Sequence, residues 1–310
     1  YFGIGPTDRQ SLVYTPAVFG SQRDTLNALL NGAALCHYPL RDEGLVGLAD
    51  WIDRSGITIF CSIASVFRQM SATLAEGRTF SQVRLVKCGG EATYWEDVDR
   101  FEKHFRSDAR LFCGFSMTET NLVTHSFVSR GQARRGSRVP LGIPVPGKEV
   151  LLLDERGVPV GPGETGALCV RSRYISTGYV GRPDRSAPVF STDPEDPGIR
   201  LFATGDLAVR LADGSIEFKG RADLQVKIRG FRVDLVEIEQ EILAVDDVVE
   251  AAAAAQDFGA GDKRVVGYLV FRPGGNATLA RVIEHLEARL PSHALPSHYR
   301  LLGSLPQTQN

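Results

Sequence analysis

The sequence predicts an α/β fold: part of a large domain, made of a parallel α/β layer and a β-rich subdomain, and a smaller C-terminal α+β domain. Three observations predict it. Short β-branched runs alternate with helix-like segments up to about residue 127. Short runs between Gly- and Pro-containing turns follow from residue 140, and strand and helix patterns alternate again after Gly220. We expect domain boundaries at 1–139, 140–221 and 222–310.

The first region alternates helix and strand patterns. Apolar residues at helical spacing predict helices over residues 24–35, 45–54, 65–75 and 95–105. Short apolar runs predict strands over residues 57–61, 83–88 and 110–113. Strands and helices at this spacing are typical of a parallel sheet covered by helices.

The second region is rich in short strands. Four runs predict strands over residues 149–153, 166–170, 207–211 and 215–218. The tripeptide Ala212-Asp213-Gly214 lies between the last two and is a strong hairpin signal.

The third region returns to a mixed pattern. Residues 225–229 alternate as in a strand, and residues 234–243 predict a helix that begins with a capping box of Asp234 and Glu237. Residues 248–255 contain an Ala run that favours a helix, although their length and the flanking Asp residues also allow a buried strand. Residues 264–271 predict a strand and residues 279–290 an amphipathic helix.

Composition limits the classes of function. The 35 Lys and Arg residues and 37 Asp and Glu residues give a formal charge of −2, so we expect no nucleic-acid or membrane partner. No apolar stretch approaches the roughly 20 residues of a spanning helix. The five cysteines are scattered singly and indicate buried thiols in a reducing, cytoplasmic compartment. Because the first residue is not Met, we expect the chain to start inside a longer protein.

The segment Gly114-Phe115-Ser116-Met117-Thr118-Glu119 is the first candidate site. It follows an apolar strand, and open α/β sheets bind ligands at the carboxyl ends of their strands. The hydroxyl of Thr118 can hold a phosphate, and the carboxylate of Glu119 can hold Mg²⁺. Ser116 and Glu119 also match a helix capping box, which the segment taken alone favours.

Two further segments contain glycines. Cys88-Gly89-Gly90-Glu91 also follows a strand, and paired glycines let a backbone approach a planar ligand, although such a pair more often marks a turn. In Ala203-Thr204-Gly205-Asp206, the carboxylate can accept hydrogen bonds from both hydroxyls of a ribose or can serve as an Asx-type turn residue.

The fourth segment is Gly220-Arg221-Ala222-Asp223-Leu224-Gln225-Val226-Lys227-Ile228-Arg229-Gly230. In an extended strand its polar side chains at 225, 227 and 229 share one face. A half-exposed strand with a solvated basic face explains part of this pattern. It does not explain the glycine at each end, the carboxylate between two domains, or an Arg suited to bidentate phosphate or ribose contact.

In this order, the segments resemble the adenylate-forming superfamily, which includes nonribosomal peptide synthetase adenylation domains, acyl-CoA and aryl-acid ligases, and luciferases. The resemblance covers nearly the whole chain. Residues 220–239 are its most specific part, because they are similar to the Gly-Arg-x-Asp-x-Gln-Val-Lys-Ile-Arg-Gly core and Glu-Ile-Glu helix start of the peptide synthetase branch. The supporting matches are Met117-Thr118-Glu119, Gly163-Glu164-Thr165-Gly166-Ala167-Leu168, Ser176-Thr177-Gly178-Tyr179, Thr204-Gly205-Asp206 and Leu305-Pro306-Gln307-Thr308-Gln309-Asn310.

The resemblance implies an enzyme that uses ATP and Mg²⁺ to activate a small carboxylic acid as an acyl-adenylate. The acyl group then passes to the phosphopantetheine thiol of a carrier protein. Thr118 would contact phosphate and Glu119 the Mg²⁺. The other implied nucleotide contacts are Gly89, Gly90 and Glu91 along the adenine, Phe115 and Phe218 as apolar faces against it, Asp206 on the ribose, and Arg221 on ribose or phosphate.

The resemblance also implies a mobile C-terminal domain. Asp223 falls at the hinge of the family, about which the small domain rotates between the two half-reactions. Lys227 and Arg229 would lie on the loop that faces the thiol donor.

The sequence departs from the family in the region of the acid. Phe115-Ser116 replaces Tyr-Gly, and Val18-Phe19-Gly20-Ser21 aligns with the Phe-Asp-x-Ser segment whose Asp pairs with the ammonium of α-amino acids. An apolar Phe19 cannot compensate a buried ammonium, so we expect an acid without a free α-amino group, such as an aryl, hydroxy or fatty acid. The side chains or backbone expected to line its pocket are those of Phe19, Gly20, Cys88 and Gly114.

The resemblance also implies two elements that these 310 residues do not contain: a glycine-rich phosphate loop, expected before residue 1, and a catalytic Lys, expected after Asn310. One preorganised cation typically contributes on the order of 10²- to 10³-fold in rate, so we expect the 310 residues alone to turn over little. A free-standing acyl-CoA ligase that uses coenzyme A is an alternative, and a catalytically inactive interaction module is a second. The presence of Thr118, Glu119, Asp206 and Arg221 argues against the inactive module.

Overall fold

The protein consists of two compact units, Tyr1–Ala222 and Asp223–Asn310. Its structure is a computed structural model that describes residues 2–15, 17–134, 136, 138–222, 225–259 and 262–306. Among these residues, no helix combines the length and the apolar character that a membrane span requires.

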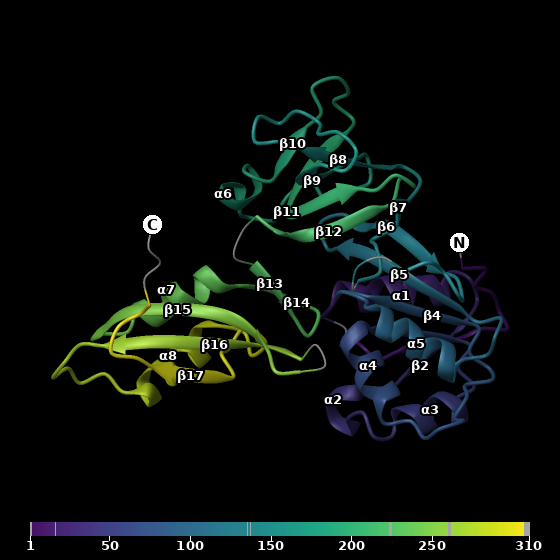
Figure 1. Cartoon of the computed structure of the whole chain (residues 1–310), viewed down its shortest axis with the longest axis horizontal. Coiled ribbons are helices and arrows are strands. Elements are labelled where there is room, and N and C mark those ends of the chain that lie inside the picture. Colours follow the sequence, from purple (N-terminus) through teal and green to yellow (C-terminus); the bar gives the residue numbers. More distant parts are fainter. Residues whose placement is uncertain are drawn as a thin grey trace. The chain divides into compact units, whose positions relative to one another are not determined.

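A seven-stranded sheet forms the centre of the larger unit, with the order β2-β1-β3-β4-β5-β6-β7 (Figure 1). The first five strands in this order pair in parallel, and β6 and β7 are antiparallel. The strands are β1 (Arg9–Leu12), β2 (Ala34–His37), β3 (Ile59–Ile63), β4 (Leu85–Gly89), β5 (Arg110–Met117), β6 (Asn121–Val128) and β7 (Ile143–Pro144). The predicted parallel α/β layer is therefore confirmed.

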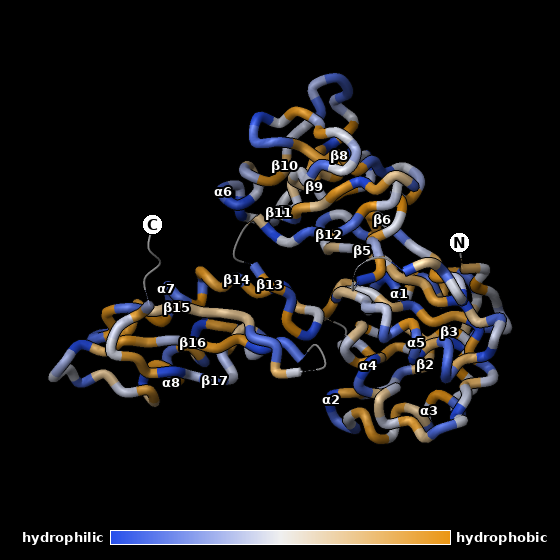
Figure 2. The backbone as a smooth tube through the Cα atoms, in the orientation of Figure 1, coloured by the Kyte–Doolittle hydropathy of each residue, from blue (hydrophilic) through white to orange (hydrophobic). Residues whose placement is uncertain are grey.

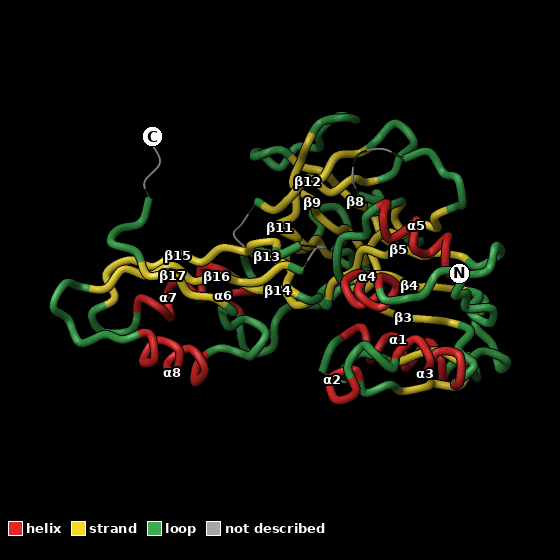
Figure 3. Tube along the Cα trace, turned by 60° about the horizontal axis from the view of Figure 1, so that its bottom comes forward, coloured by secondary structure: helices red, strands yellow, loops and turns green. Residues whose placement is uncertain are grey.

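Helices lie on both sides of this sheet (Figure 3). They are α1 (Phe19–Leu29), α2 (Leu40–Glu43), α3 (Leu48–Arg54), α4 (Ala64–Ala72) and α5 (Trp95–His104). Phe60, Val86 and Leu111 are neighbours in register and pack in one core cluster with side chains of α4 and α5. Successive strand residues face opposite sides, so Lys87 points to the other face, where it reaches Asp24 of α1.

Two of the predicted helices differ from those observed. The helix predicted over residues 24–35 begins earlier and ends earlier, at Leu29, because a turn at Gly32 (φ +74°) reverses the chain and Ala34 pairs with β1. The helix predicted over residues 45–54 begins only at Leu48, after the short helix α2.

A second, antiparallel sheet forms the β-rich part of the larger unit. Its order is β10-β11-β9-β8, and β12 pairs with β11. These elements are β8 (Lys148–Leu153), β9 (Thr165–Ser172), α6 (Pro183–Ser186), β10 (Phe190–Thr192), β11 (Arg200–Arg210) and β12 (Ile216–Arg221). The predicted hairpin between β11 and β12 is present, with Gly214 at φ +82°. Figure 2 shows that the loops around this sheet are mostly hydrophilic, whereas hydrophobic residues recur along its strands.

The smaller unit is an α+β arrangement. It contains the hairpin β13 (Gln225–Ile228) and β14 (Phe231–Asp234), α7 (Leu235–Leu243), β15 (Val248–Asp257), β16 (Lys263–Phe271), α8 (Leu279–Arg289) and β17 (His298–Leu301). Asp234 caps α7 by accepting a hydrogen bond from the Val236 N–H at 3.0 Å. The Ala run of β15 is a strand, because it pairs along its length with β16 and packs against α7.

Candidate functional site

The turn between β5 and β6 brings two sequence motifs together. Residues 118–120 connect the two antiparallel strands, so Ser116 lies in β5 and the helix capping box considered for Ser116 and Glu119 is wrong. The carboxylate of Glu119 accepts a hydrogen bond from the Tyr179 hydroxyl at 2.7 Å, and its backbone carbonyl accepts one from the Ser176 N–H at 2.8 Å. The Thr118-Glu119 turn therefore meets the Ser176–Tyr179 segment, which lies about 60 residues further along the chain.

A lysine supports the same turn. The ammonium of Lys148 donates hydrogen bonds to the carbonyl oxygens of Thr120 and Leu122, the second at 2.8 Å. Burial lowers the pKa of Lys148 to about 8. Sequence reasoning missed this residue, because nothing in its local pattern distinguishes it from a surface lysine at the start of a strand.

Asp206 and Arg221 form an ion pair across β11 and β12. The two residues are partners in register, and Arg221 Nη1 lies 2.6 Å from Asp206 Oδ1. Their side chains are 4% and 13% exposed, respectively. The Thr204 hydroxyl accepts a hydrogen bond from the Asp206 N–H at 3.0 Å, within β11 where the register to β9 shifts between Ala203 and Leu207. The carboxylate and the guanidinium are thus held together at one point of the sheet.

The paired glycines lie at the carboxyl end of β4, beside Gly114 of β5. Gly90 has φ +78°, which explains the glycine as a turn residue. Gly89 is the register partner of Gly114, and a Cβ atom on Gly89 would lie 3.4 Å from the Gly114 carbonyl oxygen. The Glu91 carboxylate accepts a hydrogen bond from the Ser65 N–H at 2.9 Å, at the first turn of α4. Glu91 therefore caps a helix in this structure.

The remaining predicted contact residues of the larger unit differ in exposure. Phe115 is 7% exposed, in an apolar cluster that joins β5 and β6 to the β-rich part. Phe218 is half-buried, and the guanidinium carbon of Arg138 lies 5.8 Å from the centroid of its ring. Phe19 and Gly20 are half-buried in the first turn of α1.

Cys88, which we expect to line the acid pocket, is buried in the structure. Its side chain is 2% exposed and belongs to the core cluster that packs against α4 and α5. The physical reason is the pleat of β4, which directs Cys88 to this face and the preceding residue, Lys87, to the opposite face.

The predicted thiol-donor residues lie on the hairpin of the smaller unit. Lys227 is in β13, and Arg229 and Gly230 form the turn with φ angles of +48° and +83°. Arg229 lies 3.5 Å from Asp262 and is largely exposed. Asp223, the predicted hinge, lies outside the described residues.

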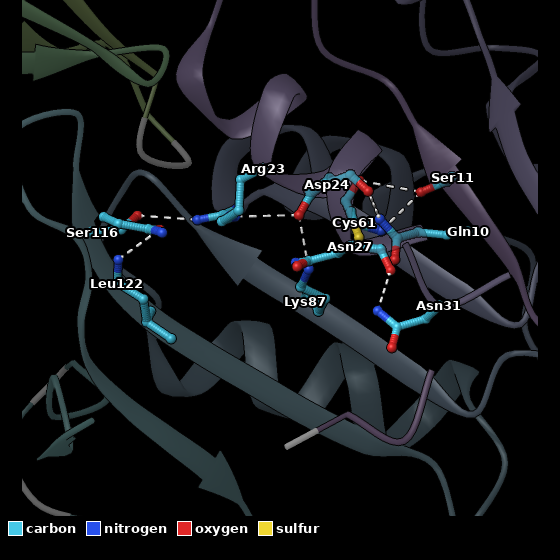
Figure 4. A network of polar contacts seen from close by, with 11 residues as sticks. Gln10, Ser11, Arg23, Asp24, Asn27, Asn31, Cys61, Lys87, Ser116 and Leu122 are labelled. Carbon is cyan, nitrogen blue, oxygen red and sulfur yellow. Dashed lines mark hydrogen bonds and ion pairs between the residues drawn. The ribbon is translucent and has the colours of Figure 1, made fainter. Parts of the chain in front are cut away.

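Sequence reasoning missed a buried polar network behind these strand ends (Figure 4). Asp24 of α1 accepts hydrogen bonds from Lys87 at 2.8 Å and from Arg23 at 3.3 Å. Arg23 also donates to the Ser116 hydroxyl at 3.4 Å, which links the network to the Thr118-Glu119 motif. The sequence contains a signal for this network: Lys87 lies within the apolar run of a predicted parallel strand, where a lysine is buried and needs an acidic partner.

Comparisons with known proteins find related sequences and solved structures. The family model described as "AMP-binding enzyme" matches residues 1–180, and "AMP-binding enzyme C-terminal domain" matches residues 237–310. Malpibaldin synthetase of Mortierella alpina is 33% identical over 315 residues, which is 99% of this chain and 6% of the relative.

Two solved structures are similar. IdnL1 is 30% identical with a TM-score of 0.83, over 98% of this chain and 62% of that one. PA1221, described as a nonribosomal peptide synthetase protein that contains adenylation and PCP domains, is 23% identical with a TM-score of 0.86, over 99% of this chain and 52% of that one. The chain spans 12% or less of the length of the first curated relatives.

Proposed function

Because the chain belongs to the AMP-binding enzyme family, we propose that it activates a carboxylic acid with ATP as an acyl-adenylate and passes the acyl group to a carrier-protein phosphopantetheine thiol. In the first step, an oxygen of the acid attacks the α-phosphorus of ATP. A new C–O–P linkage forms, the bond between the α-phosphorus and its bridging oxygen breaks, and pyrophosphate leaves. In the second step the thiolate attacks the acyl carbon, and AMP leaves.

The observation that carries this proposal is the meeting of Thr118-Glu119 with Ser176–Tyr179. Phosphoryl chemistry of this kind depends mainly on positioning and on stabilisation of charge. Thr118 is exposed on the turn, so its hydroxyl can donate to a phosphate oxygen. Tyr179 holds one carboxylate oxygen of Glu119, which orients the group.

Glu119 fits the Mg²⁺ that the family implies. Its carboxylate is an oxygen donor on a half-exposed turn, and Mg²⁺ is held in proteins by one or two carboxylates together with substrate phosphates. When bound there, the ion would neutralise phosphate charge. Asp206 would accept hydrogen bonds from the ribose hydroxyls, and Arg221, which is held beside it at 2.6 Å, would contact ribose or phosphate.

The acceptor and the acid follow from two further features. The similarity of residues 220–239 to the peptide synthetase branch supports a carrier protein as acceptor, with Lys227 and Arg229 on the donor-facing hairpin. Coenzyme A is the alternative acceptor. Phe19, half-buried in the first turn of α1, supports an acid without a free α-amino group, because no carboxylate stands at this position to pair with an ammonium.

Acid-dependent exchange between pyrophosphate and ATP, measured with the full-length protein that contains this chain, tests the proposal. We expect exchange that requires Mg²⁺ and an acid and that falls by about 10²-fold or more in Glu119→Gln. Asp184→Asn, at an exposed ion pair with Arg182, is the matched control and should leave exchange unchanged.

The outcomes separate the parts of the proposal. Absence of both exchange and ATP binding would support the inactive interaction module. Strong exchange with ordinary α-amino acids would contradict the predicted substrate class. Mass spectrometry of the product distinguishes an acylated carrier protein from an acyl-CoA.

A further inference from the structure

A cluster of charged side chains lies between α1 and the strands β4 and β5 of the larger unit (Figure 4). Arg23 and Asp24 come from α1 and Lys87 from β4, and Arg23 reaches Ser116 near the end of β5. The side chains of Asp24 and Lys87 are 1% and 6% exposed, whereas that of Arg23 is 23% exposed. Arg23 is thus the member of the cluster that a ligand can reach.

The cluster carries one positive charge in excess, since two cations share one carboxylate. Burial opposes ionisation of Asp24, but Lys87 and Arg23 hold the pKa of this carboxyl below its usual range. Burial raises the pKa of Tyr14, Cys61 and Cys88, that of Cys61 to about 12, so these neighbours are neutral near pH 7. A buried charge without a counter-ion is costly, so the excess charge favours an anionic ligand.

The guanidinium of Arg23 has donors available for such a ligand. Of the five N–H groups of a guanidinium, Arg23 uses two on residues that the structure describes, Nε on Asp24 and Nη1 on Ser116. The contact with Ser116 is long, at 3.4 Å. A planar guanidinium binds a carboxylate with two parallel hydrogen bonds.

Arg23 also shares a helix face with the residues expected to line the acid pocket. Phe19 and Gly20 precede it by four and three residues, the spacing of neighbours on a helix surface. A Cβ atom on Gly20 would lie 3.9 Å from Arg23 Nη2, so the guanidinium lies over the bare backbone of Gly20.

We propose that Arg23, supported by Lys87, binds a second anionic group of the acid, so that the substrate class is a dicarboxylic acid. One carboxylate is activated, and the other accepts hydrogen bonds from Arg23. This inference rests on the proposed function. The excess positive charge also repels an ammonium, in agreement with the expected absence of a free α-amino group.

Pyrophosphate exchange with the full-length protein tests the inference with acids matched in length. The probes are succinate, glutarate and adipate, each compared with the straight-chain monocarboxylate of the same carbon number. Arg23→Gln is the informative variant, because Asp24 keeps its ion pair with Lys87 and the cluster becomes neutral. Arg41→Gln, at an exposed position in α2, is the matched control.

We expect the unmodified protein to favour a dicarboxylate. Arg23→Gln should raise the KM of that acid by about 10- to 100-fold, the usual loss for a hydrogen bond between charged partners. It should leave the values for monocarboxylates unchanged, and Arg41→Gln should change neither. Arg23→Lys keeps the charge but loses the planar fork, so it should give an intermediate KM; this variant also serves if Arg23→Gln fails to fold by circular dichroism.

Two results would overturn the inference. The first is a preference for monocarboxylates, together with a kcat that Arg23→Gln lowers equally for all acids. Arg23 would then only position Ser116, and the proposed activation of an acid by ATP would remain supported. Absence of exchange with every acid, together with absence of ATP binding, would overturn the inference and the proposed function together.

Discussion

Removal of the Tyr179 hydroxyl should lower adenylate formation about tenfold. In Tyr179→Phe, the Glu119 carboxylate loses the hydrogen bond that orients it, at 2.7 Å. A hydrogen bond to a charged group contributes about 1.5–3 kcal/mol. Because Tyr179 is 37% exposed, water competes for the carboxylate and the lower value, about 1.5 kcal/mol, applies. This free energy corresponds to about a tenfold change in rate.

The assay is acid-dependent pyrophosphate exchange with the full-length protein, with kcat and KM for ATP·Mg²⁺ measured separately. Tyr174→Phe is the matched control, because Tyr174 lies two residues before the Ser176–Tyr179 segment and is 72% exposed. A double-mutant cycle adds the decisive comparison. If Tyr179 acts through Glu119, Tyr179→Phe should have no further effect in the Glu119→Gln background.

Two results would refute this reasoning. One is an unchanged kcat/KM in Tyr179→Phe, or a decrease that Tyr174→Phe reproduces. The other is additivity of Tyr179→Phe with Glu119→Gln, which would show that the hydroxyl acts independently of the carboxylate.

Three further predictions concern stability and reactivity of the larger unit. Two guanidinium nitrogens of Arg68 each donate a hydrogen bond of 2.7 Å to the buried Asp97 carboxylate. Arg68→Met leaves this carboxylate without its partner, so the free energy of unfolding, measured in urea by tryptophan fluorescence, should fall by about 3–5 kcal/mol. A fall below about 1 kcal/mol would contradict this prediction. Burial lowers the pKa of Lys148 from 10.5 to about 8, so between these pH values the folded state binds fewer protons than the unfolded state. In urea titrations, the free energy of unfolding of the unmodified protein should therefore rise with pH relative to that of Lys148→Met. If the two proteins show the same pH dependence, the lowered pKa is contradicted. Burial raises the thiol pKa of four cysteines, Cys61, Cys88, Cys113 and Cys169, whereas Cys36 is half-buried. A disulfide reagent should therefore label Cys36 first, as followed by mass spectrometry. Earlier labelling of any of the other four would contradict this order.

Several elements could be predicted from local patterns. Residues 264–271 and 279–290 have clear strand and helix periods, and both elements lie within one residue of the predicted bounds. The hairpin at 212–214 also follows from local chemistry, because Gly214 adopts a positive φ that glycine allows without strain. In each case the deciding interactions are between residues close in sequence.

Other elements depended on distant partners. The Ala run of residues 248–255 allowed a helix or a strand, and pairing with β16 decides for the strand. The motif at Ser116 allowed a capping box, but its pairing with Leu122 across the β5–β6 turn makes it part of a strand. Propensity is a weak preference of less than about 1 kcal/mol per residue, which tertiary pairing easily exceeds.

The sequence by itself determined which residue types with the chemistry of nucleotide and acid recognition are present, and in which order. Only the tertiary structure decided which of them meet. The contacts of Tyr179 with Glu119 and of Arg23 with Ser116 join segments 60 and 93 residues apart. The pleat of β4 buries Cys88 in the core and directs Lys87 to Asp24. Such contacts depend on strand register, in which a shift of one residue moves every side chain to the opposite face, and local patterns do not encode register across distant strands.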